Sequence, residues 1–395
     1  MVIDAWLEPY NGTTVSTRRF VAALEAAGHR VEVLGIDADA PGATRTKGGA
    51  TAFRQLSIPG FNRLINSMRA PLAEPDRARI RQALSRCDLL HVQFPFFLGY
   101  ATVVEAQKMG VPVVCSFHVQ PENILLNIGL RGELLRGWLY RLFIWAFYAR
   151  ADLVIAPTPF AADLLLAHGV TRPIRVVSNG VPAAFFAVER APVADGRVRI
   201  LSVGRLAKEK SQETLLRAVA ACTHRDRIDL TLAGAGPRED ELKRLAVSLG
   251  LDVHIGPVSD ADLLAGYAGA DLFVHCGAVE LEGMSVLEAM AMGLPILVSD
   301  SPDSALARLI PDEARRFHAS DPTDLAAKLD DWLERPEELA AEGVSNRTFA
   351  EGFAHARSVE ALVGAYGAVV GVRNESEPSR RPSPLGGEGG READG

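Results

Sequence analysis

Short apolar segments alternate with amphipathic ones along the chain, and the alternation occurs twice. In the first half the apolar segments are residues 2–6, 32–36, 88–94, 112–119, 152–158 and 174–180. In the second half they are residues 198–204, 228–234, 251–256, 270–276 and 295–300. Apolar runs of this length, separated by helical patterns, are typical of parallel strands joined by helices. We therefore predict an α/β protein with two doubly wound sheets.

A polar segment at residues 187–196 separates the two halves, since it contains Pro and Gly and lacks periodicity. The length of 395 residues also exceeds the size at which a single core usually stops growing. We predict an N-terminal domain over residues 1–187 and a C-terminal domain over residues 188–353. A last helix is expected over residues 354–372. The polar tail at residues 373–395 has almost no apolar residues to bury, so it is expected to be disordered.

The composition argues against several classes of protein. The formal net charge of -7 provides no overall attraction to nucleic acid, so no nucleic-acid partner is expected. The four cysteines lack CxxC or metal-ligand spacing, which predicts reduced thiols in a cytoplasmic protein. We find no signal-peptide pattern, and no apolar run reaches the roughly 18 residues of a membrane span. The expected location is the cytoplasm, with the inner face of the cytoplasmic membrane as a possible peripheral site.

Polar loops follow several predicted strands at their carboxyl ends, where doubly wound sheets bind ligands. The first of these loops places Asn11 and Gly12 before a helix, where backbone N–H groups can face a phosphate or sugar hydroxyls. His118 follows another strand and can exchange a proton near neutral pH. Each feature has a structural alternative, namely a plain turn or a structural histidine.

Two cations, Arg205 and Lys210, lie five residues apart in the loop after a strand of the second half. They can clamp a diphosphate, because Arg grips oxygens in pairs and Lys supplies a point charge. A solvated basic loop is the alternative. Gly234 and Gly236 suggest a dinucleotide fingerprint, but Glu239 stands where its third glycine would be, so no nicotinamide site is expected.

The stretch from Glu280 to Gly293 combines carboxylates with a glycine before an apolar helix. Gly283 is expected at the helix N-terminus, where unpaired N–H groups can face a phosphate. Glu280 in the loop and Glu288 in the helix can each accept hydrogen bonds from sugar or ribose hydroxyls. The alternatives are favourable first-turn charge or a solvated helix face.

Two segments combine positive charge with apolar residues. The cations of residues 40–73, which contain no acid, are Arg45, Lys47, Arg54, Arg63 and Arg69. Residues 131–150 interleave arginines with Trp138, Tyr140, Phe143, Trp145, Phe147 and Tyr148. Segments of this kind can lie on an anionic membrane surface. For the second segment, the alternative is a buried helix with arginines at its ends.

Together these loops resemble the retaining glycosyltransferases of family GT4. The motifs that carry the resemblance are the paired glutamates of ELEGMSVLEAMAMGLPI, GRLAKEK, LAGAGP, SNGV at residues 178–181 and the NG before the first helix. The resemblance runs from about residue 2 to residue 370. It implies the GT-B fold, in which two Rossmann-like domains face a central cleft and a C-terminal helix, here about residues 355–370, crosses back to the first domain.

The resemblance also implies roles for individual residues. Arg205 and Lys210 would bind the nucleotide diphosphate, and Glu288 would bind the ribose hydroxyls. Glu280 would hold hydroxyls of the transferred sugar, and His118 would lie near the reacting centre. The full set of residues expected to bind the donor is Gly12, Arg205, Lys210, Glu280, Gly283, Met284, Ser285 and Glu288. The expected catalytic set is His118, Arg205, Lys210 and Glu280.

The reaction implied by the family is transfer of a hexose, with retention, from a nucleotide-diphosphate sugar to an acceptor hydroxyl. We expect a UDP-sugar rather than a GDP-sugar, and a membrane lipid such as diacylglycerol as the acceptor. A polysaccharide or soluble acceptor, or a nucleotide-sugar epimerase of the same fold, is the alternative. No DxD-like acidic cluster is placed to hold Mg²⁺, so we predict a metal-independent reaction without a cofactor.

One residue departs from the family pattern. Many relatives have an aromatic residue before the glycine that follows the first glutamate, whereas this chain has Glu282 before Gly283. Glu282 is expected either to be solvated or to influence the choice of sugar.

Overall fold

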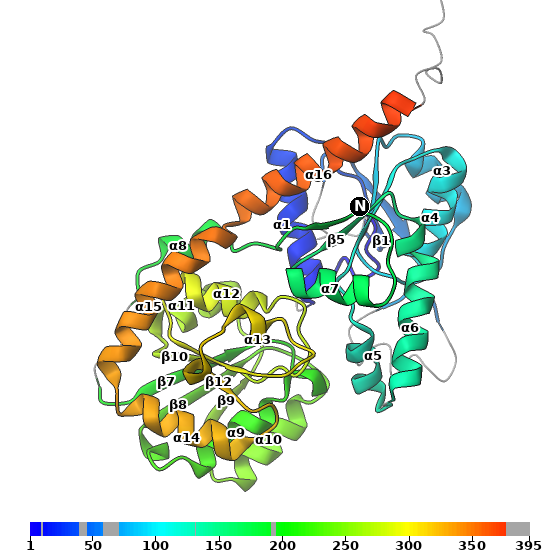
Figure 1. Cartoon of the computed structure of the whole chain (residues 1–395). Coiled ribbons are helices and arrows are strands. Elements are labelled where there is room, and N and C mark those ends of the chain that lie inside the picture. Colours follow the sequence, from blue (N-terminus) through cyan, green and yellow to red (C-terminus); the bar gives the residue numbers. More distant parts are fainter. Residues whose placement is uncertain (9–10, 39–45, 58–70, 131, 191–194, 377–395) are drawn as a thin grey trace, which may run out of the picture.

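The computed structural model describes residues 1–8, 11–38, 46–57, 71–130, 132–190 and 195–376, without the side chains of residues 336–340 and 372–376. Two parallel sheets, each covered by helices, form two Rossmann-like domains (Figure 1). The prediction of an α/β protein with two doubly wound sheets is confirmed.

The sheet of the N-terminal domain is completed by the first residues of the chain. Its strands are β1 Val33–Ile36, β2 Ala50–Phe53, β3 Leu90–Val92, β4 Val113–Ser116, β5 Leu153–Ala156 and β6 Ile174–Val176. β1 pairs with β2, and β3 to β6 pair in chain order. Val2 forms parallel bridges to both Leu34 and Val92, and it thereby joins the two groups of strands.

The predicted first strand over residues 2–6 is too long. Backbone pairing with β1 ends at Asp4, whose carbonyl accepts from the Ile36 N–H at 3.2 Å. The chain turns directly afterwards, and the Glu8 N–H donates to the Ala5 carbonyl at 3.0 Å. The turn takes the chain toward the loop before the first helix, so residues 5 and 6 leave the sheet.

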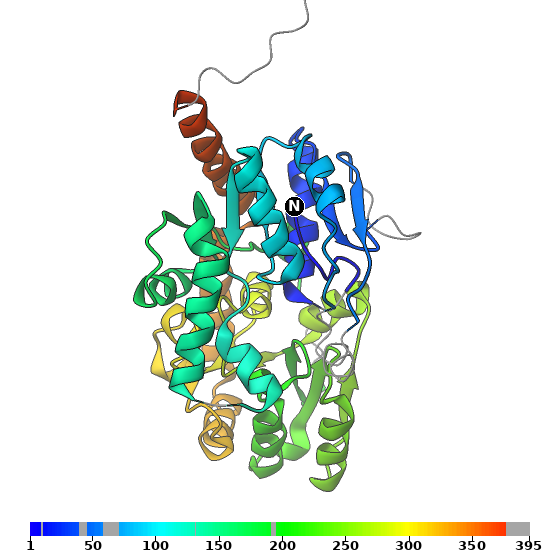
Figure 2. The ribbon, with the colours of Figure 1, turned by 90° about the vertical axis from the view of Figure 1, so that its right-hand side faces the viewer.

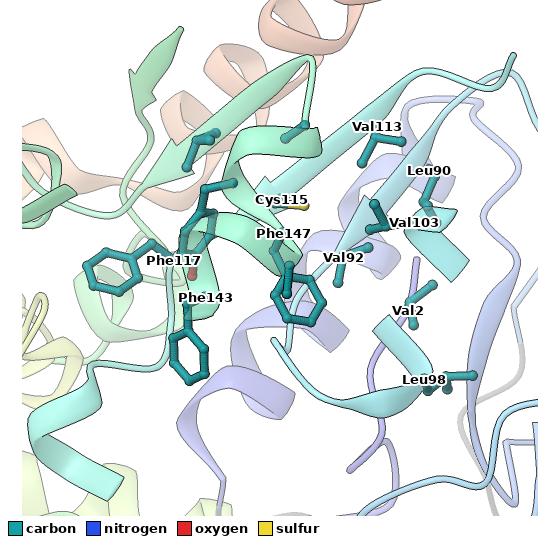
Figure 3. Close-up of a cluster of buried hydrophobic side chains, with 14 of the residues drawn as sticks. Val2, Leu90, Val92, Leu98, Val103, Val113, Cys115, Phe117, Phe143 and Phe147 are labelled. Atoms are coloured by element: carbon teal, nitrogen blue, oxygen red, sulfur yellow. The ribbon is translucent and has the colours of Figure 1, made fainter. Parts of the chain in front are cut away.

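Both faces of this sheet are covered. The helices of the domain are α1 Gly12–Ala26, α3 Arg77–Leu84, α4 Phe97–Met109, α5 Pro121–Ile128, α6 Glu133–Ala146, η1 Tyr148–Arg150 and α7 Pro159–Ala167. The short helix α8 Ala183–Ala187 packs on the C-terminal domain instead, since Phe185 belongs to an apolar cluster of that domain. Figure 3 shows one buried cluster, in which Val92 and Cys115 of the sheet lie near Phe147, the residue after α6, while Phe143 of α6 lies on the side of Phe117. A second cluster on the other face includes Trp6, Phe20 and Val114.

The C-terminal domain has a six-stranded sheet in the order β12-β11-β10-β7-β8-β9. Its strands are β7 Val198–Val203, β8 Ile228–Ala233, β9 Val253–Gly256, β10 Leu272–His275, β11 Ile296–Ser299 and β12 Arg316–Phe317. Successive residues of β7 face opposite sides, so Ile200 and Leu201 belong to two different apolar clusters. This double burial explains why the strands of the second half are nearly continuous apolar runs.

The helices of the C-terminal domain connect these strands. They are η2 Lys208–Lys210, α9 Gln212–Ala221, η3 Arg225–Arg227, α10 Glu239–Ser248, α11 Asp260–Gly269, α12 Met284–Ala291, α13 Leu306–Leu309, η4 Glu313–Arg315, α14 Pro322–Leu333, α15 Pro336–Ala350 and η5 Glu351–Phe353. Within the described residues, no helix combines the length and apolar character needed to cross a bilayer.

The last helix, α16 (His355–Ser376), crosses back onto the N-terminal domain, as both views show (Figures 1 and 2). Its Tyr366 hydroxyl lies 2.6 Å from Nδ1 of His91, and the His355 ring packs 5.0 Å from the Phe20 ring. The helix continues through Ser376, so residues 373–376, predicted as part of the tail, are helical. Residues 377–395 of the predicted tail lie outside the described residues.

The two segments that pass between the domains run side by side. The Val181 N–H donates to the Phe353 carbonyl at 2.8 Å, and the His355 N–H donates to the Val181 carbonyl at 2.9 Å. Gly180 sits at this crossing with a φ of 75°, and a Cβ atom there would lie 2.6 Å from Cα of His355. The crossing therefore requires glycine at this position.

A Gly180→Ala variant should lower the free energy of unfolding by at least about 2 kcal/mol. Alanine is strained in the left-handed backbone conformation, and its Cβ atom would also clash with the backbone of His355. Gly364→Ala is the matched control, since this glycine lies in α16 with nothing within 4 Å of an added Cβ. The control should be neutral or stabilising by roughly 0.5–1 kcal/mol. Equal unfolding midpoints for the two variants in urea would show that the crossing is not constrained in this way.

Candidate active site

A cavity of about 720 Å³ lies between the two domains. Loops at the carboxyl ends of strands from both sheets line it, as expected for doubly wound folds. The predicted residues that line it are Gly12, His118, Arg205, Lys210, Glu280, Gly283, Met284, Ser285 and Glu288. The structure thus brings every residue of the predicted site to one cavity, whereas their individual roles stay predictions.

Glu280 is held as a carboxylate by two neighbours. Lys210 forms an ion pair with it, and Nε2 of His275 lies 2.9 Å from its Oε1 atom. Burial alone would raise the pKa of Glu280, but Lys210 and His275 outweigh it and lower the pKa to about 2. Glu280 is therefore ionised at neutral pH and can accept hydroxyl hydrogen bonds.

Arg205 is held by a carboxylate that sequence reasoning missed. Its Nη2 atom lies 2.5 Å from Oε1 of Glu209, a residue only 2% exposed. The other oxygen of Glu209 accepts from Nδ2 of Asn127 on α5 at 3.0 Å. Glu209 thereby connects the Arg205 loop to the N-terminal domain. It lies within the GRLAKEK motif, but nothing in the sequence shows that its side chain is buried.

Glu288 makes its closest contact across the cleft. Nη1 of Arg19, on α1, lies 2.9 Å from Oε1 of Glu288, and the Tyr267 hydroxyl donates to the Oε2 atom at 3.3 Å. Burial raises the pKa of Glu288, and Arg19 opposes that rise. Sequence reasoning missed Arg19, because only the folded chain brings α1 next to α12.

His118 follows β4 and lies at the cavity wall, where its Nε2 atom is 3.1 Å from Oε1 of Gln93. Burial lowers its pKa to about 4. The imidazole is therefore neutral at neutral pH, and its single N–H, on Nε2, is donated to Gln93. The Nδ1 atom is left as an acceptor, which suits a sugar hydroxyl.

Gly283 precedes α12, as the sequence predicts. It has a φ of 78°, and a Cβ atom there would lie 2.5 Å from Cδ2 of Leu306, so the tight entry to the helix requires glycine. Met284 and Ser285 form the first turn and line the cavity. Their N–H groups have no acceptor within the helix, so this end of α12 favours an anion.

Glu282 is not solvated, which excludes one of the two expectations for it. It is 4% exposed, and its Oε1 atom accepts from the Ser178 hydroxyl at 2.5 Å and from the Asn179 N–H at 3.0 Å. Burial raises the pKa of Glu282, these hydrogen bonds lower it, and the outcome is a pKa of about 7.

Two family models match the chain. The model described as Glycosyltransferase Family 4 matches residues 10–185, and the model described as Glycosyl transferases group 1 matches residues 187–347. A GDP-mannose-dependent alpha-mannosyltransferase of Mycolicibacterium smegmatis is 32% identical over 313 residues, or 76% of this chain and 79% of that protein. The chain therefore belongs to family 4 of the glycosyltransferases, and the predicted membership is confirmed.

Two further comparisons extend this result. An alpha-monoglucosyldiacylglycerol synthase of Streptococcus pneumoniae is 28% identical over 231 residues, or 54% of this chain and 52% of that protein. The structure of sucrose-phosphate synthase from Thermosynechococcus elongatus, 18% identical, aligns with a TM-score of 0.73 over 94% of this chain and 98% of that one. The structural likeness concerns the fold, and it confirms the predicted GT-B architecture.

The buried His118 should make stability depend on pH. Its pKa in the folded chain is about 4 against an ordinary value of 6.5, so its neutral form favours folding above pH 6.5, and this contribution is lost as pH falls toward 4. Between pH 7.5 and pH 5, wild type should lose about 2 kcal/mol more unfolding free energy than His118→Gln. Urea unfolding of both proteins at both pH values gives the two losses of unfolding free energy. The other histidines contribute equally to both losses, so the difference between the losses reports His118 alone. Parallel losses in the two proteins would contradict the assignment.

Proposed function

We propose that this glycosyltransferase moves a hexose, with retention, from a nucleotide-diphosphate sugar to a hydroxyl of a membrane lipid. The cavity between the domains is the observation that supports a nucleotide-sugar donor. Arg205, Lys210 and the N-terminus of α12 lie on one side of it. His118 and Gly12 line the opposite, N-terminal side. A diphosphate suits the first group, and a sugar with many hydroxyls suits the space between the two.

The positive groups would act on the leaving group. The bond between the anomeric carbon and the diphosphate oxygen breaks, and the acceptor oxygen bonds to that carbon. The acceptor proton passes to the departing diphosphate. Arg205, Lys210 and the α12 N–H groups would stabilise the negative charge that grows on the diphosphate, and such preorganised electrostatic stabilisation is often the largest catalytic contribution. No carboxylate nucleophile is needed.

The ion pairs of the cavity must rearrange before these residues can bind the donor. Lys210 is paired with Glu280, so a bound donor must draw Lys210 toward its phosphates while Glu280 turns to the sugar hydroxyls. The exchange replaces one charge-assisted contact with two, which favours the bound state. We expect a similar exchange at the ribose, in which Glu288 leaves Arg19 to accept ribose hydroxyls.

The identity of the donor base stays a prediction. The expectation from the sequence is a UDP-sugar, whereas the name of the mycobacterial relative gives GDP-mannose as the donor of that protein. Metal independence also stays a prediction. In the described part of the chain, no group of three or more His, Cys, Asp or Glu residues is placed to hold a metal ion. The cations of the cavity would neutralise the diphosphate in place of a metal ion.

The lipid acceptor is supported by an apolar face on α6. Leu134, Trp138, Leu142 and Trp145 follow one another at helical spacing and are all exposed, Leu134 by 90%. The opposite face of α6 packs Tyr140 and Phe143 into the core, as the alternative of a buried helix expects. The membrane role of residues 131–150 stays a prediction. Exposed Leu and Trp beside arginine are typical of helices that lie at a membrane surface.

The α6 face continues toward the cavity. α5 and α6 extend from the N-terminal domain toward the C-terminal domain (Figures 1 and 2). Ile124 of α5 lines the cavity, and Ile128, one turn later, is exposed. Leu130 is exposed between the two helices. An amphiphile could keep its apolar part along this path while its hydroxyl enters the cleft, in keeping with the name of the pneumococcal relative, a glucosyldiacylglycerol synthase.

The other predicted membrane segment, residues 40–73, is only partly described. Arg45, Arg63 and Arg69 lie outside the described residues. Lys47 donates from Nζ to the Glu25 carbonyl at 2.8 Å, and Arg54 is exposed next to β2. The contribution of this segment to membrane binding stays a prediction.

Lys210→Ala should lower kcat/KM for transfer roughly 100- to 1,000-fold, as expected when one stabilising charge is removed from the leaving group. The neighbouring exposed Lys208, which does not line the cavity, provides the control Lys208→Ala. The assay offers UDP-glucose, UDP-galactose or GDP-mannose with diacylglycerol, and mass spectrometry identifies the product. EDTA should leave the rate unchanged.

Equal activity of Lys210→Ala and Lys208→Ala would contradict the proposed donor site. Product from donor alone, without diacylglycerol, would instead indicate an epimerase or hydrolase. Transfer only to a sugar acceptor would replace the lipid with a soluble or polysaccharide acceptor.

The α6 face should bind vesicles of phosphatidylglycerol and phosphatidylcholine. The variant Leu134→Ser/Trp138→Ser should sediment with them at least tenfold less than wild type, because it removes two anchors from the interface. Leu166→Ser is the control, since Leu166 is an exposed leucine on α7 outside this face. Binding should weaken with salt. Equal sedimentation of the double variant and the control would contradict the docking surface.

A further inference from the structure

The carboxylate of Glu282 is buried between the two domains without a cation. It takes part in none of the ion pairs found among the described residues. Both of its oxygens accept hydrogen bonds instead. Ser178 and the Asn179 N–H donate to Oε1 at 2.5 and 3.0 Å, and the Asn179 side-chain amide donates to Oε2. A buried carboxylate satisfied in this way is costly to disturb, because removing its donors leaves a charge unpaired.

These hydrogen bonds join the two domains. Glu282 belongs to the loop between β10 and α12, whereas Ser178 and Asn179 follow β6 and lead into the crossing at Gly180. Next to Glu282, the Leu281 carbonyl accepts from the Thr158 hydroxyl of the N-terminal domain at 2.7 Å. The same short loop therefore contacts the first domain through consecutive residues.

The contacts continue to α1 and to the crossing. The Ser16 hydroxyl of α1 donates to the Asn179 side-chain oxygen, so the amide of Asn179 bridges α1 and Glu282. The Gly180 N–H donates to the Ser178 hydroxyl at 3.0 Å, and Val181 then pairs with residues 353–355. Glu282 is thus two hydrogen bonds away from the helix that begins at Gly12, on the other side of the cavity.

We propose that Glu282 is a positioning residue that holds the cleft closed by fixing the loop of Glu280 and Gly283 to the crossing segment and, through Asn179, to α1. Its position is suited to this role, because Glu280, two residues before it, and Gly283, directly after it, both line the donor cavity. A change in the Glu282 contacts would therefore shift the donor groups relative to the first domain.

The chemistry of the side chain explains why a glutamate suits this position. A carboxylate offers several acceptor sites and meets the three donor groups of Ser178 and Asn179 at once, whereas an amide has a single acceptor oxygen. Above a pH of about 7, where the carboxyl group is ionised, these hydrogen bonds go to a charged acceptor and are about twice as strong as neutral ones. An aromatic residue at this position would leave the Asn179 amide and N–H without these acceptors.

The rival explanation is a direct contact between Glu282 and the transferred sugar, since Glu282 also lines the cavity. The two explanations differ in the free protein. A positioning residue affects the crossing segment without any ligand, whereas a sugar-binding residue affects only donor binding.

Amide hydrogen exchange of the unliganded protein tests the proposal. At a pH of about 8, above the pKa of Glu282, exchange at residues 178–181 and 283–287 should be about tenfold or more faster in Glu282→Gln, since charge-assisted hydrogen bonds are lost. Residues 239–248 of α10, away from the cleft, should exchange as in wild type. Glu313→Gln, which changes a 93% exposed glutamate, is the matched control and should exchange as wild type throughout.

Ser178→Ala provides a second variant that leaves the carboxylate and Asn179 in place. It should accelerate exchange at the same segments by about threefold, because it removes one donor to Glu282. The Gly180 amide is left out of this comparison, since the variant also removes its own acceptor. If Glu282→Gln does not fold, the exchange rates of Ser178→Ala test the positioning role of Glu282. Exchange at residues 178, 179 and 181 that matches wild type in every folded variant would overturn the proposal, whatever the activity.

The kinetic readout rests on the proposed function. In Glu282→Gln, kcat should fall about tenfold or more with a smaller change in donor KM, and donor hydrolysis should rise relative to transfer, because an open cleft admits water. A rise in donor KM with unchanged exchange would favour direct sugar contact and overturn the positioning role. Faster exchange in a protein that transfers no sugar would instead contradict the proposed function and leave the Glu282 contacts in place.

Discussion

Hydrogen bonds and ion pairs join the two domains around the cleft, beside an apolar contact of Leu281 and Ala305 with the N-terminal core. The arrangement of the cleft depends on these polar contacts. Glu282 with Asn179, Arg19 with Glu288, and Glu209 with Asn127 each reach from one domain to the other. A large apolar interface would hold the domains in one arrangement. The Arg19–Glu288 ion pair, whose arginine is 24% exposed, can be exchanged for contacts with ligand at a lower cost than the buried Glu282 contacts. Such an interface suits an enzyme that must admit a donor, exclude water during transfer and release a nucleotide.

The cations of the cavity are also held by contacts that a ligand can replace. Each cation expected at the diphosphate already has a carboxylate partner, Glu209 for Arg205 and Glu280 for Lys210. Two unneutralised cations close together in a partly buried cavity would repel each other. The carboxylates of Glu209 and Glu280 neutralise Arg205 and Lys210 and so reduce this repulsion. A diphosphate would compete for the same cations, so the strength of donor binding depends on how easily Lys210 leaves Glu280.

Much of the fold could be predicted, because strands buried on both faces must be apolar along their whole length. The loops of Arg205 and Glu280 could be found because ligands bind where parallel strands end. Arg19 and His275 were missed, since each acquires its role from a partner that only the fold brings close. The burial of Glu282 could not be predicted either, because a glutamate beside a glycine usually indicates an exposed turn. The end of the first strand was misplaced because the turn at residues 4–7 has no glycine or proline to mark it.

The central claim is that the cleft binds a nucleoside diphosphate through cations that are released from carboxylates. A crystal structure of the chain with UDP or GDP tests it most directly. We predict the diphosphate at the N-terminus of α12, with Nζ of Lys210 moved from Glu280 to a phosphate oxygen and Glu288 moved from Arg19 to the ribose. A nucleotide bound outside the cleft, or a bound nucleotide with the Lys210–Glu280 and Arg19–Glu288 pairs both intact, would contradict the account.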